Sequence, residues 1–201
     1  MVEPVVSPRA GKTASVQASG GIPSIMTFVA ADVLSFVLFF AAFMYDRLAQ
    51  TSVFNESAAR LDINFGLLNT LILITSGWLV ARAAIAAKDD NVAGFRANLM
   101  GSVIIGLGFG IVKFTEYAAK INQGITAYTN DFFAYYYMLT AIHFLHYIVG
   151  IVLLVIILFM MKGREKFSSA DLNWIKSSAV YWHMVDLLWI LLFPMLYLQG
   201  A

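Results

Sequence analysis

The stretch YWHMVDLLWILLFPMLYL, residues 181–198, decides how the rest of the chain is interpreted. It is apolar enough to enter a lipid bilayer, yet it carries His183 and Asp186, which lie three residues apart and so on nearly one face of a helix. An aspartate in the middle of a membrane span costs roughly 3 kcal/mol on insertion scales, so it needs a partner inside a helix bundle or a bound proton. The stretch therefore predicts membrane helices that share buried polar groups.

The composition of the 201-residue chain points the same way, since 60% of its residues are hydrophobic and only 12% are charged. Its mean hydropathy of +0.77 indicates an integral membrane protein with one compact domain at most. A net charge of +1 offers no basic surface for nucleic acid. The absence of cysteine excludes disulfides, thiolate metal sites and cysteine nucleophiles, and it leaves three histidines as candidate metal or haem ligands.

Five segments are long enough to cross about 30 Å of hydrocarbon, and they predict an all-α bundle of five transmembrane helices. The predicted spans are 24–45, 62–86, 97–119, 131–161 and 175–199. Residues 1–23 are polar and contain no long apolar run, which predicts a disordered cytoplasmic tail and no cleaved signal peptide. Residues 24–201 then form a single membrane domain, in which the polar stretch 46–62 is predicted to be a solvent-facing loop.

The distribution of basic residues orients these spans, because an odd number of spans puts the two termini on opposite sides of the membrane. The side of the N-terminus holds nine of the 13 Lys and Arg residues: Arg9, Lys12, Arg82, Lys88, Arg96, Lys162, Arg164, Lys166 and Lys176. The opposite side holds Arg47, Arg60, Lys113 and Lys120. By the positive-inside rule we expect the N-terminus in the cytoplasm and the C-terminus outside.

Polar groups in three of the spans fall at one depth. Counted from the outer ends of their helices at 1.5 Å per residue, Asp32, His143 and Asp186 each lie about 18 Å into the membrane. His146 and His183 lie about one turn deeper. A carboxylate beside an imidazole would recover part of the desolvation that each suffers alone. We therefore predict one buried polar cluster, in which a histidine of the fourth span lies within hydrogen-bond reach of Asp32 or Asp186.

The cluster makes a mutational prediction about its two acids. If Asp186 is the better-bonded of the two, Asp186→Ala should impair assembly more than Asp32→Ala does.

Two further features mark the third span. Gly106 and Gly110 form a GxxxG spacing, which allows another backbone to approach closely. Near the end of the span, Glu116 can pair with Lys120 at i,i+4, which predicts a solvated acid at the membrane interface.

Three functions fit these residues. A structural polar cluster is favoured, with coupled protonation as a second use of the same groups. A b-type haem between His146 and His183 would need the two rings to face each other across a gap. An independent transporter could use Asp32 and the polar stripe of the second span, although Asn69 and Ser76 are typical of side chains that bond across helices.

Three motifs resemble subunit III of the haem-copper oxidases. Residues 181–198 are similar to the closing helix of that family, in which an aromatic residue is followed by W-H, V-D and W. IHFLHYIVGIVLL, residues 142–154, resembles its H-x-x-H helix, and KFTEY, residues 113–117, matches the place of its E-Y pair. The resemblance covers essentially residues 24–200 in order, and Asp32 stands where many members carry a glutamate.

The five-helix length resembles the short bacterial form of this family, which implies a multi-pass protein of the bacterial inner membrane. GLLNTLILITSGWLVARA, residues 66–83, and GITAYTNDFFAYYYMLTAIHFLH, residues 124–146, are similar to the branch associated with nitric oxide reductase clusters and so with denitrification.

The resemblance implies a non-catalytic accessory subunit of a respiratory complex, either a cytochrome c or quinol oxidase or a nitric oxide reductase. Such a subunit packs on catalytic subunit I, binds phospholipid and supports assembly and proton uptake. Haem and copper belong to the partner subunits, so we expect no catalytic residue, metal site or cofactor in this chain.

Overall fold

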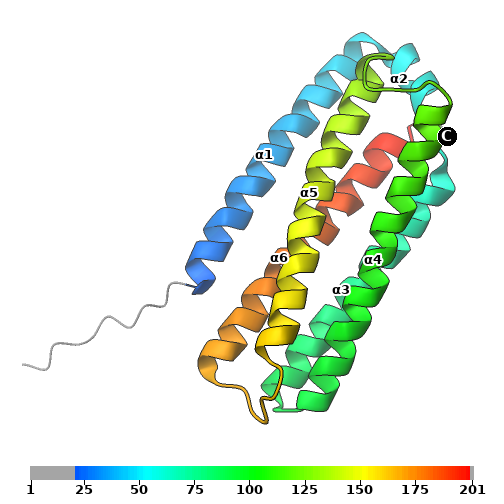
Figure 1. The fold of residues 1–201 in the computed structure, drawn as a ribbon. Coiled ribbons are helices and arrows are strands. Elements are labelled where there is room, and N and C mark those ends of the chain that lie inside the picture. The colour runs from blue at the N-terminus through cyan, green and yellow to red at the C-terminus, as the bar shows by residue number, and fades with distance from the viewer. Residues whose placement is uncertain (1–20, 200–201) are drawn as a thin grey trace, which may run out of the picture.

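The computed structural model describes residues 21–199, with side chains from residue 25 onward (Figure 1). The elements in this range are all α-helices: α1 (Gly21–Ala49), α2 (Thr51–Ala58), α3 (Ile63–Lys88), α4 (Val92–Asn122), α5 (Asp131–Met160) and α6 (Ser169–Tyr197). Five of them, all but α2, are long and apolar enough to cross a membrane, which confirms the predicted five-helix architecture. The tail predicted over residues 1–23 falls on residues 1–20, outside the described range, and on the first residues of α1.

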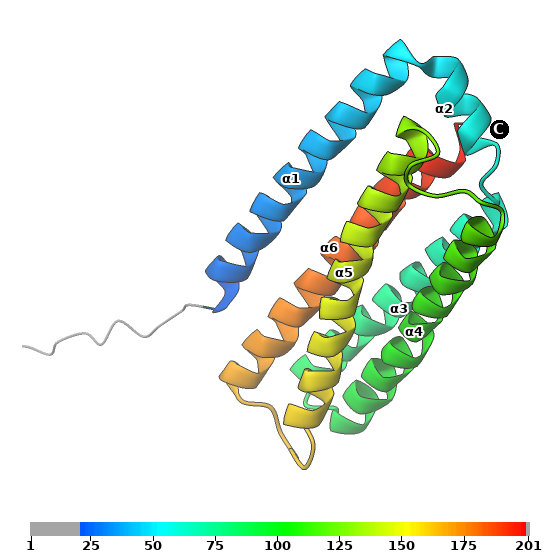
Figure 2. The ribbon, with the colours of Figure 1, turned by 45° about the horizontal axis from the view of Figure 1, so that its top comes forward.

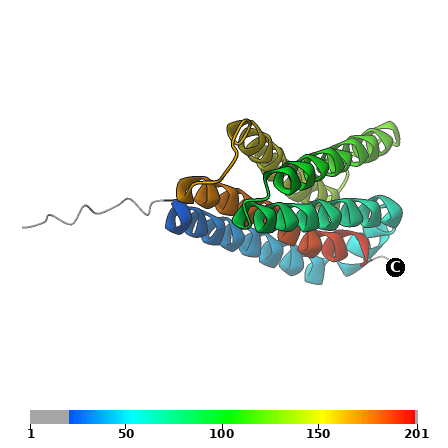
Figure 3. The same cartoon turned by 90° about the horizontal axis from the view of Figure 1, so that it is seen from below.

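Helices α3, α4, α5 and α6 form a bundle in which each packs on the next and α3 also packs on α6. Helix α1 lies mainly against α6 and, less closely, against α5, and Figure 2 shows it on the other side of these two helices from α3 and α4. The α3–α4 turn and the α5–α6 loop lie at the end of the bundle where α1 begins, and α6 ends at the opposite end (Figures 1 and 3). Which end faces the cytoplasm stays a prediction.

Side-chain caps explain where four helices begin. The caps are Asp62 for α3, Asn91 for α4, Asn130 for α5 and Ser168 for α6. Each accepts a hydrogen bond from a backbone N–H in the first turn, a group that the helix itself leaves unpaired. Because these caps lie in polar sequence, α4 begins at Val92 and α6 at Ser169, ahead of the predicted starts at 97 and 175.

The stretch predicted to be a solvent-facing loop contains the short helix α2, so that prediction is wrong for its central residues. The Phe54 side chain is fully buried. Its ring centroid lies 5.2 Å from that of Phe43 in α1 and 5.7 Å from that of Phe132 in α5. One aromatic residue in an otherwise polar stretch thus holds α2 over the ends of two membrane helices.

The glycine pair of α4 makes room for side chains of the neighbouring helices. A Cβ atom on Gly106 would lie 3.1 Å from Ile151 Cδ1, and one on Gly110 would lie 3.0 Å from the Tyr147 hydroxyl. Tyr147 donates that hydroxyl to the Gly106 carbonyl at 3.1 Å. The spacing therefore joins α4 to α5 through a tyrosine seated against the glycine face.

The polar stripe of the second membrane helix does bond across helices, as predicted for Ser76. Its hydroxyl lies 3.0 Å from the Ser102 carbonyl and 2.9 Å from the Ser102 hydroxyl in α4. Asn69 is equally buried, but neither atom of its amide has a hydrogen-bond partner in the described part of the chain. Two serines therefore hydrogen-bond α3 to α4.

Candidate functional site

Helix α4 carries an ion pair in the interior of the bundle. Lys113 Nζ lies 2.9 Å from Glu116 Oε2, and the side chains are 1% and 0% exposed. Their i,i+3 spacing puts both on one face of α4, and side chains of α5 and α6 reach this face. Two charges this deeply buried are stable only when each finds further hydrogen-bond partners besides the other.

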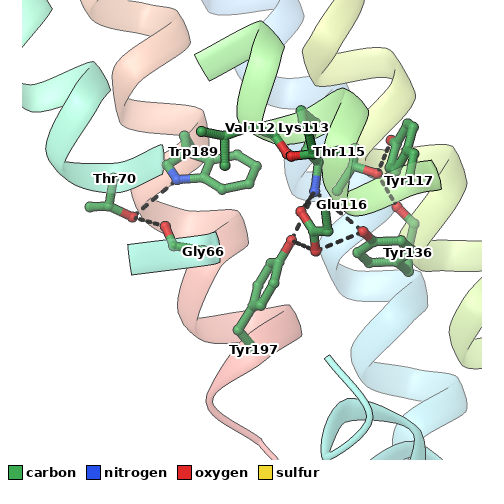
Figure 4. A network of polar contacts seen from close by, with 11 residues as sticks. Gly66, Thr70, Val112, Lys113, Thr115, Glu116, Tyr117, Tyr136, Trp189 and Tyr197 are labelled. Atoms are coloured by element: carbon green, nitrogen blue, oxygen red, sulfur yellow. Dashed lines mark hydrogen bonds and ion pairs between the residues drawn. The ribbon is translucent and has the colours of Figure 1, made fainter. Parts of the chain in front are cut away.

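Two tyrosines from neighbouring helices supply those partners, and Figure 4 shows them converging on the ion pair. Tyr136 of α5 and Tyr197 of α6 donate their hydroxyls to Glu116 Oε1 at 2.9 and 2.6 Å. The Tyr197 hydroxyl in turn accepts a hydrogen bond from Lys113 Nζ at 2.8 Å. The ion pair therefore joins α4, α5 and α6 in one network of charge-assisted hydrogen bonds.

Aromatic rings surround the lysine ammonium. Nζ lies between 4.9 and 5.5 Å from the ring centroids of Tyr117, Tyr136, Trp189 and Tyr197. Electron-rich ring faces at this range stabilise a cation that has lost its water. Trp189 also donates its indole N–H to the Thr70 hydroxyl of α3 at 3.0 Å, so the assembly reaches all four helices of the bundle. We call Lys113, Glu116, Tyr136 and Tyr197 the interior network.

The interior network corrects the prediction for Glu116, which is not a solvated interfacial acid. The predicted partner, Lys120, is itself buried and donates to the backbone carbonyl of Arg60. Lys113 takes its place as the partner of Glu116. The reason is that two tyrosine hydroxyls from other helices stabilise the buried carboxylate. Residue spacing within one helix does not predict such contacts between helices.

The predicted contact between Asp32 and a histidine of the fourth span is confirmed. His146 Nε2 lies 3.0 Å from Asp32 Oδ1, and the side chains are 16% and 14% exposed. His146 Nδ1 lies 2.8 Å from the Ile142 carbonyl, which can only accept, so Nδ1 carries a hydrogen. The contact at Nε2 then requires one more proton, held either by the imidazole or by the carboxyl group. Asp32 and His146 therefore share a proton between α1 and α5.

The second acid forms a looser pair within α6. His183 Nδ1 lies 3.5 Å from Asp186 Oδ2, and the side chains are 46% and 10% exposed. The Asp186 carboxylate sits directly against Gly77 of α3, where an added Cβ atom would clash with Oδ2. Its other oxygen, Oδ1, has no hydrogen-bond partner in residues 21–199.

His143 stands apart from both pairs. Its ring centroid lies 5.5 Å from that of Phe109 and 5.2 Å from that of Trp189, and its ring nitrogens have no hydrogen-bond partner among the described residues. The prediction of a single polar cluster is therefore wrong, because its five members form two pairs and one isolated imidazole. Depth along a helix can be counted from the sequence, whereas the direction in which a side chain points around the bundle cannot.

The geometry also bears on whether a b-type haem could bind between His146 and His183. Both ring nitrogens of His146 are engaged, one by Asp32 and one by the Ile142 carbonyl. His183 directs Nδ1 at Asp186. A haem iron between these two histidines would have to break the Asp32–His146 contact. Within residues 21–199, no three His, Asp or Glu side chains gather in an arrangement that could hold a metal ion.

Sequence reasoning did not single out Lys113, Tyr136 or Tyr197. For the lysine a signal exists, because it lies four residues after Phe109 and three after Gly110, within a stripe of α4 residues that all face the interior. The buried members of this stripe are Phe95, Leu99, Ser102, Gly106, Phe109, Gly110, Lys113, Glu116 and Lys120. For the tyrosines the sequence holds no comparable signal, since Tyr136 is the middle of three consecutive tyrosines.

Comparison with known proteins finds similarity over almost the whole chain. The sequence profile described as cytochrome c oxidase subunit III matches residues 8–201. The chain is 27% identical over 174 residues to cytochrome c oxidase subunit 3 of Thermostichus vulcanus, covering 87% of this chain and 85% of the relative. It is 31% identical over 184 residues to cytochrome c oxidase subunit 3 of Heterololigo bleekeri, covering 88% of this chain and 69% of the relative.

A third relative has a composite name. The chain is 27% identical over 180 residues to the haem-copper oxidase subunit I+III of Aeropyrum pernix, a match that covers 87% of this chain and 22% of that much longer relative.

Proposed function

This chain belongs to the cytochrome c oxidase subunit III family, and from that premise we propose that it is the accessory subunit III of a respiratory haem-copper complex in a bacterial inner membrane. It packs on the catalytic subunit, which carries the haem and copper, and it supports assembly, phospholipid binding and proton uptake. The observation that carries the proposal is the family match over residues 8–201 on a multi-pass membrane bundle.

The composite relative supports a partnership with subunit I. A protein named for subunits I and III together contains a region similar to 87% of this chain. Two units that share one polypeptide stay tethered to each other in every molecule, which supports a place for a separate subunit III beside subunit I.

The interior network supports an accessory role over a catalytic one. Glu116 accepts hydrogen bonds from Lys113, Tyr136 and Tyr197, and all four side chains are buried. A general acid or base must reach a reacting group, whereas the donors and acceptors of these side chains are hydrogen-bonded to one another. Their contribution is to hold three helices in a fixed arrangement.

Phospholipid binding finds its support in α1. In the most hydrophobic part of this span only 6% of the residues are buried, against 56% for α6. An α1 so poorly covered by its own chain presents apolar surface to lipid or to another subunit. We place bound phospholipid beside α1.

The Asp32–His146 pair is the group that we assign to proton uptake. It holds a proton between two side chains that are each slightly exposed, so a neighbouring subunit can exchange that proton. Ionisable groups within membrane spans are typical of proton relays. The interior network is closed to such exchange, since Lys113 and Glu116 are at most 1% exposed.

The test is affinity purification of the full chain from native membranes in a mild detergent. We expect a second subunit with many membrane spans to be recovered in a fixed ratio, and the reduced-minus-oxidised spectrum of the eluate to show haem. An unrelated tagged membrane protein of similar size, purified in parallel, should recover neither. Repeated recovery of this chain alone would contradict the proposal.

The same eluate tests the nitric oxide reductase branch, which stays a prediction from the sequence. Consumption of oxygen with a quinol or cytochrome c donor indicates an oxidase. Consumption of nitric oxide without oxygen uptake assigns the complex to denitrification.

A further inference from the structure

His183 occupies an unusual position for a polar side chain. It is the central residue of α6 (Ser169–Tyr197), so it lies about 20 Å from either end of that helix. Its side chain is nevertheless 46% exposed on the outside of the described chain. A polar imidazole at this depth faces hydrocarbon unless another protein covers it, and ionisable groups at membrane depth almost always face a bundle interior or a cavity.

Four other ionisable residues of the membrane spans avoid this exposure. Lys113 and Glu116 are at most 1% exposed, and Asp32 and His146 are 14% and 16% exposed. His183 stands out because Nδ1 approaches Asp186 only to 3.5 Å, while Nε2 has no partner within residues 21–199. The α6 pair is therefore incompletely satisfied by this chain alone.

The residues around His183 form a surface that a membrane helix could cover. Leu187 and Ile190 follow at i+4 and i+7 on α6, so they continue the same outward stripe, and they are 51% and 42% exposed. Gly77 of α3 lies beneath the pair and keeps the two helix backbones close to it. Ile74, one turn before Gly77, is 49% exposed. We call His183, Leu187, Ile190 and Ile74 the α3–α6 surface.

We propose that the α3–α6 surface is the docking site for a transmembrane helix of the catalytic subunit, which hydrogen-bonds His183 near the middle of the membrane. The proposal rests on the proposed function for the existence of that subunit and adds which face of this chain meets it. The partner helix carries a polar side chain, such as Ser, Thr, Asn or Gln, opposite His183 and apolar side chains one and two turns along.

Chemistry favours a protein helix over lipid as the occupant. Acyl chains offer no hydrogen bond to Nε2, and phospholipid headgroups lie near the ends of α6, about 20 Å away. In a membrane, polar side chains that bond across helices are a recognised source of association, because lipid cannot satisfy them. A closely approaching helix also needs a shallow surface, which the glycine under the pair helps to provide.

Site-specific photo-cross-linking in native membranes tests the assignment. Benzoylphenylalanine replaces Leu187 on the α3–α6 surface in one variant of the full chain and Leu145 on α5 in another, a matched position that is 61% exposed. We expect irradiation of the Leu187 variant to join this chain to the haem-bearing subunit, and the Leu145 variant to give a yield of that product at least tenfold lower. Equal yields, or a product from Leu145 alone, would overturn the assignment.

A pair of substitutions tests His183 itself. In His183→Leu we expect the haem-bearing subunit recovered per molecule of this chain to fall about tenfold while the amount of chain in the membrane is unchanged. His183→Gln, which keeps a hydrogen-bonding group, should recover most of that loss. Unchanged recovery in His183→Leu would refute the role of His183, whereas failure of the unmodified chain to recover any haem-bearing subunit would refute the proposed function instead.

Discussion

Two pairs of a basic and an acidic side chain in this molecule share one sequence spacing and have opposite surroundings. Lys113 and Glu116 in α4, and His183 and Asp186 in α6, each place the acid three residues after the base. The α4 pair is 2.9 Å long and at most 1% exposed, whereas the α6 pair is 3.5 Å long and its histidine is 46% exposed. The first is complete within this chain, and the second is left open on one side.

The difference indicates what each polar pair stabilises: the fold of this chain or its contact with a partner. Tyr136 and Tyr197 close the interior network, so its loss should damage the chain itself. The α6 pair has no such neighbours, so its loss should spare the chain and damage what binds to it. Variants that separate chain stability from partner recovery test this contrast.

The largest effect is expected from Glu116→Ala. Removal of the carboxylate leaves the Lys113 ammonium buried without its counter-ion, which should lower the free energy of unfolding by about 3–5 kcal/mol. Unfolding of the detergent-solubilised chain by titration with a denaturing detergent measures this change. The double variant Lys113→Met/Glu116→Gln removes both charges and should be less destabilised than Glu116→Ala. A double variant that is worse than the single one would mean that the ion pair itself is strongly stabilising.

A smaller loss is expected from Tyr197→Phe. This hydroxyl bonds both Glu116 and Lys113, and a hydrogen bond to a charged group contributes about 1.5–3 kcal/mol. Tyr181→Phe is the matched control in the same helix, because its hydroxyl bonds only the neutral His146 carbonyl at 3.3 Å. Its cost should be about 0.5–1.5 kcal/mol in the same unfolding assay. Equal costs for the two tyrosines would contradict the special status of the interior network.

The next largest effect on the free energy of unfolding is expected from loss of the Asp32–His146 contact. A double-mutant cycle with Asp32→Asn and His146→Leu should give a coupling free energy of about 1 kcal/mol, since cross-helix polar contacts in membranes are of that size.

We had expected Asp186→Ala to impair assembly more than Asp32→Ala if Asp186 were better bonded. The distances of 3.0 Å for Asp32 and 3.5 Å for Asp186 reverse that condition. Asp32→Ala should therefore destabilise the chain more, and the opposite order would show that distance does not rank the two acids.

The smallest effect on stability is expected from Gly77→Ala. The new Cβ atom clashes with the end of the Asp186 side chain, which can turn away, and lies in ordinary contact with His183 Nδ1 at 3.5 Å, so the free energy of unfolding should change by less than about 1 kcal/mol. Turning Asp186 away removes the support of His183, so recovery of the haem-bearing subunit should fall. Gly108→Ala is the control, because its Cβ atom would lie 3.4 Å from Ile72 Cδ1 in ordinary contact. A partner yield that drops equally in both variants would argue against the α3–α6 surface.

The helices were predictable because hydrocarbon thickness fixes the length of an apolar span. Their starts after caps such as Asn91 and Ser168 were not, because these caps lie in polar sequence outside the apolar runs. The Asp32–His146 contact was predictable because the two residues lie within about one helical turn of each other in counted depth on different helices. Neither the burial of Glu116 nor the isolation of His143 could be counted in that way. Both depend on how each helix is rotated in the bundle, which is set by the packing of residues far apart in the chain.

One measurement tests the contrast between the two pairs most directly: the ratio of haem-bearing subunit to folded chain, determined in parallel for Glu116→Ala and His183→Leu. We predict that His183→Leu lowers the ratio about tenfold at an unchanged amount of folded chain. We predict that Glu116→Ala reduces the amount of folded chain and leaves the ratio for the surviving molecules close to that of the unmodified protein. The reverse pattern, with His183→Leu losing folded chain and Glu116→Ala losing only its partner, would contradict the account.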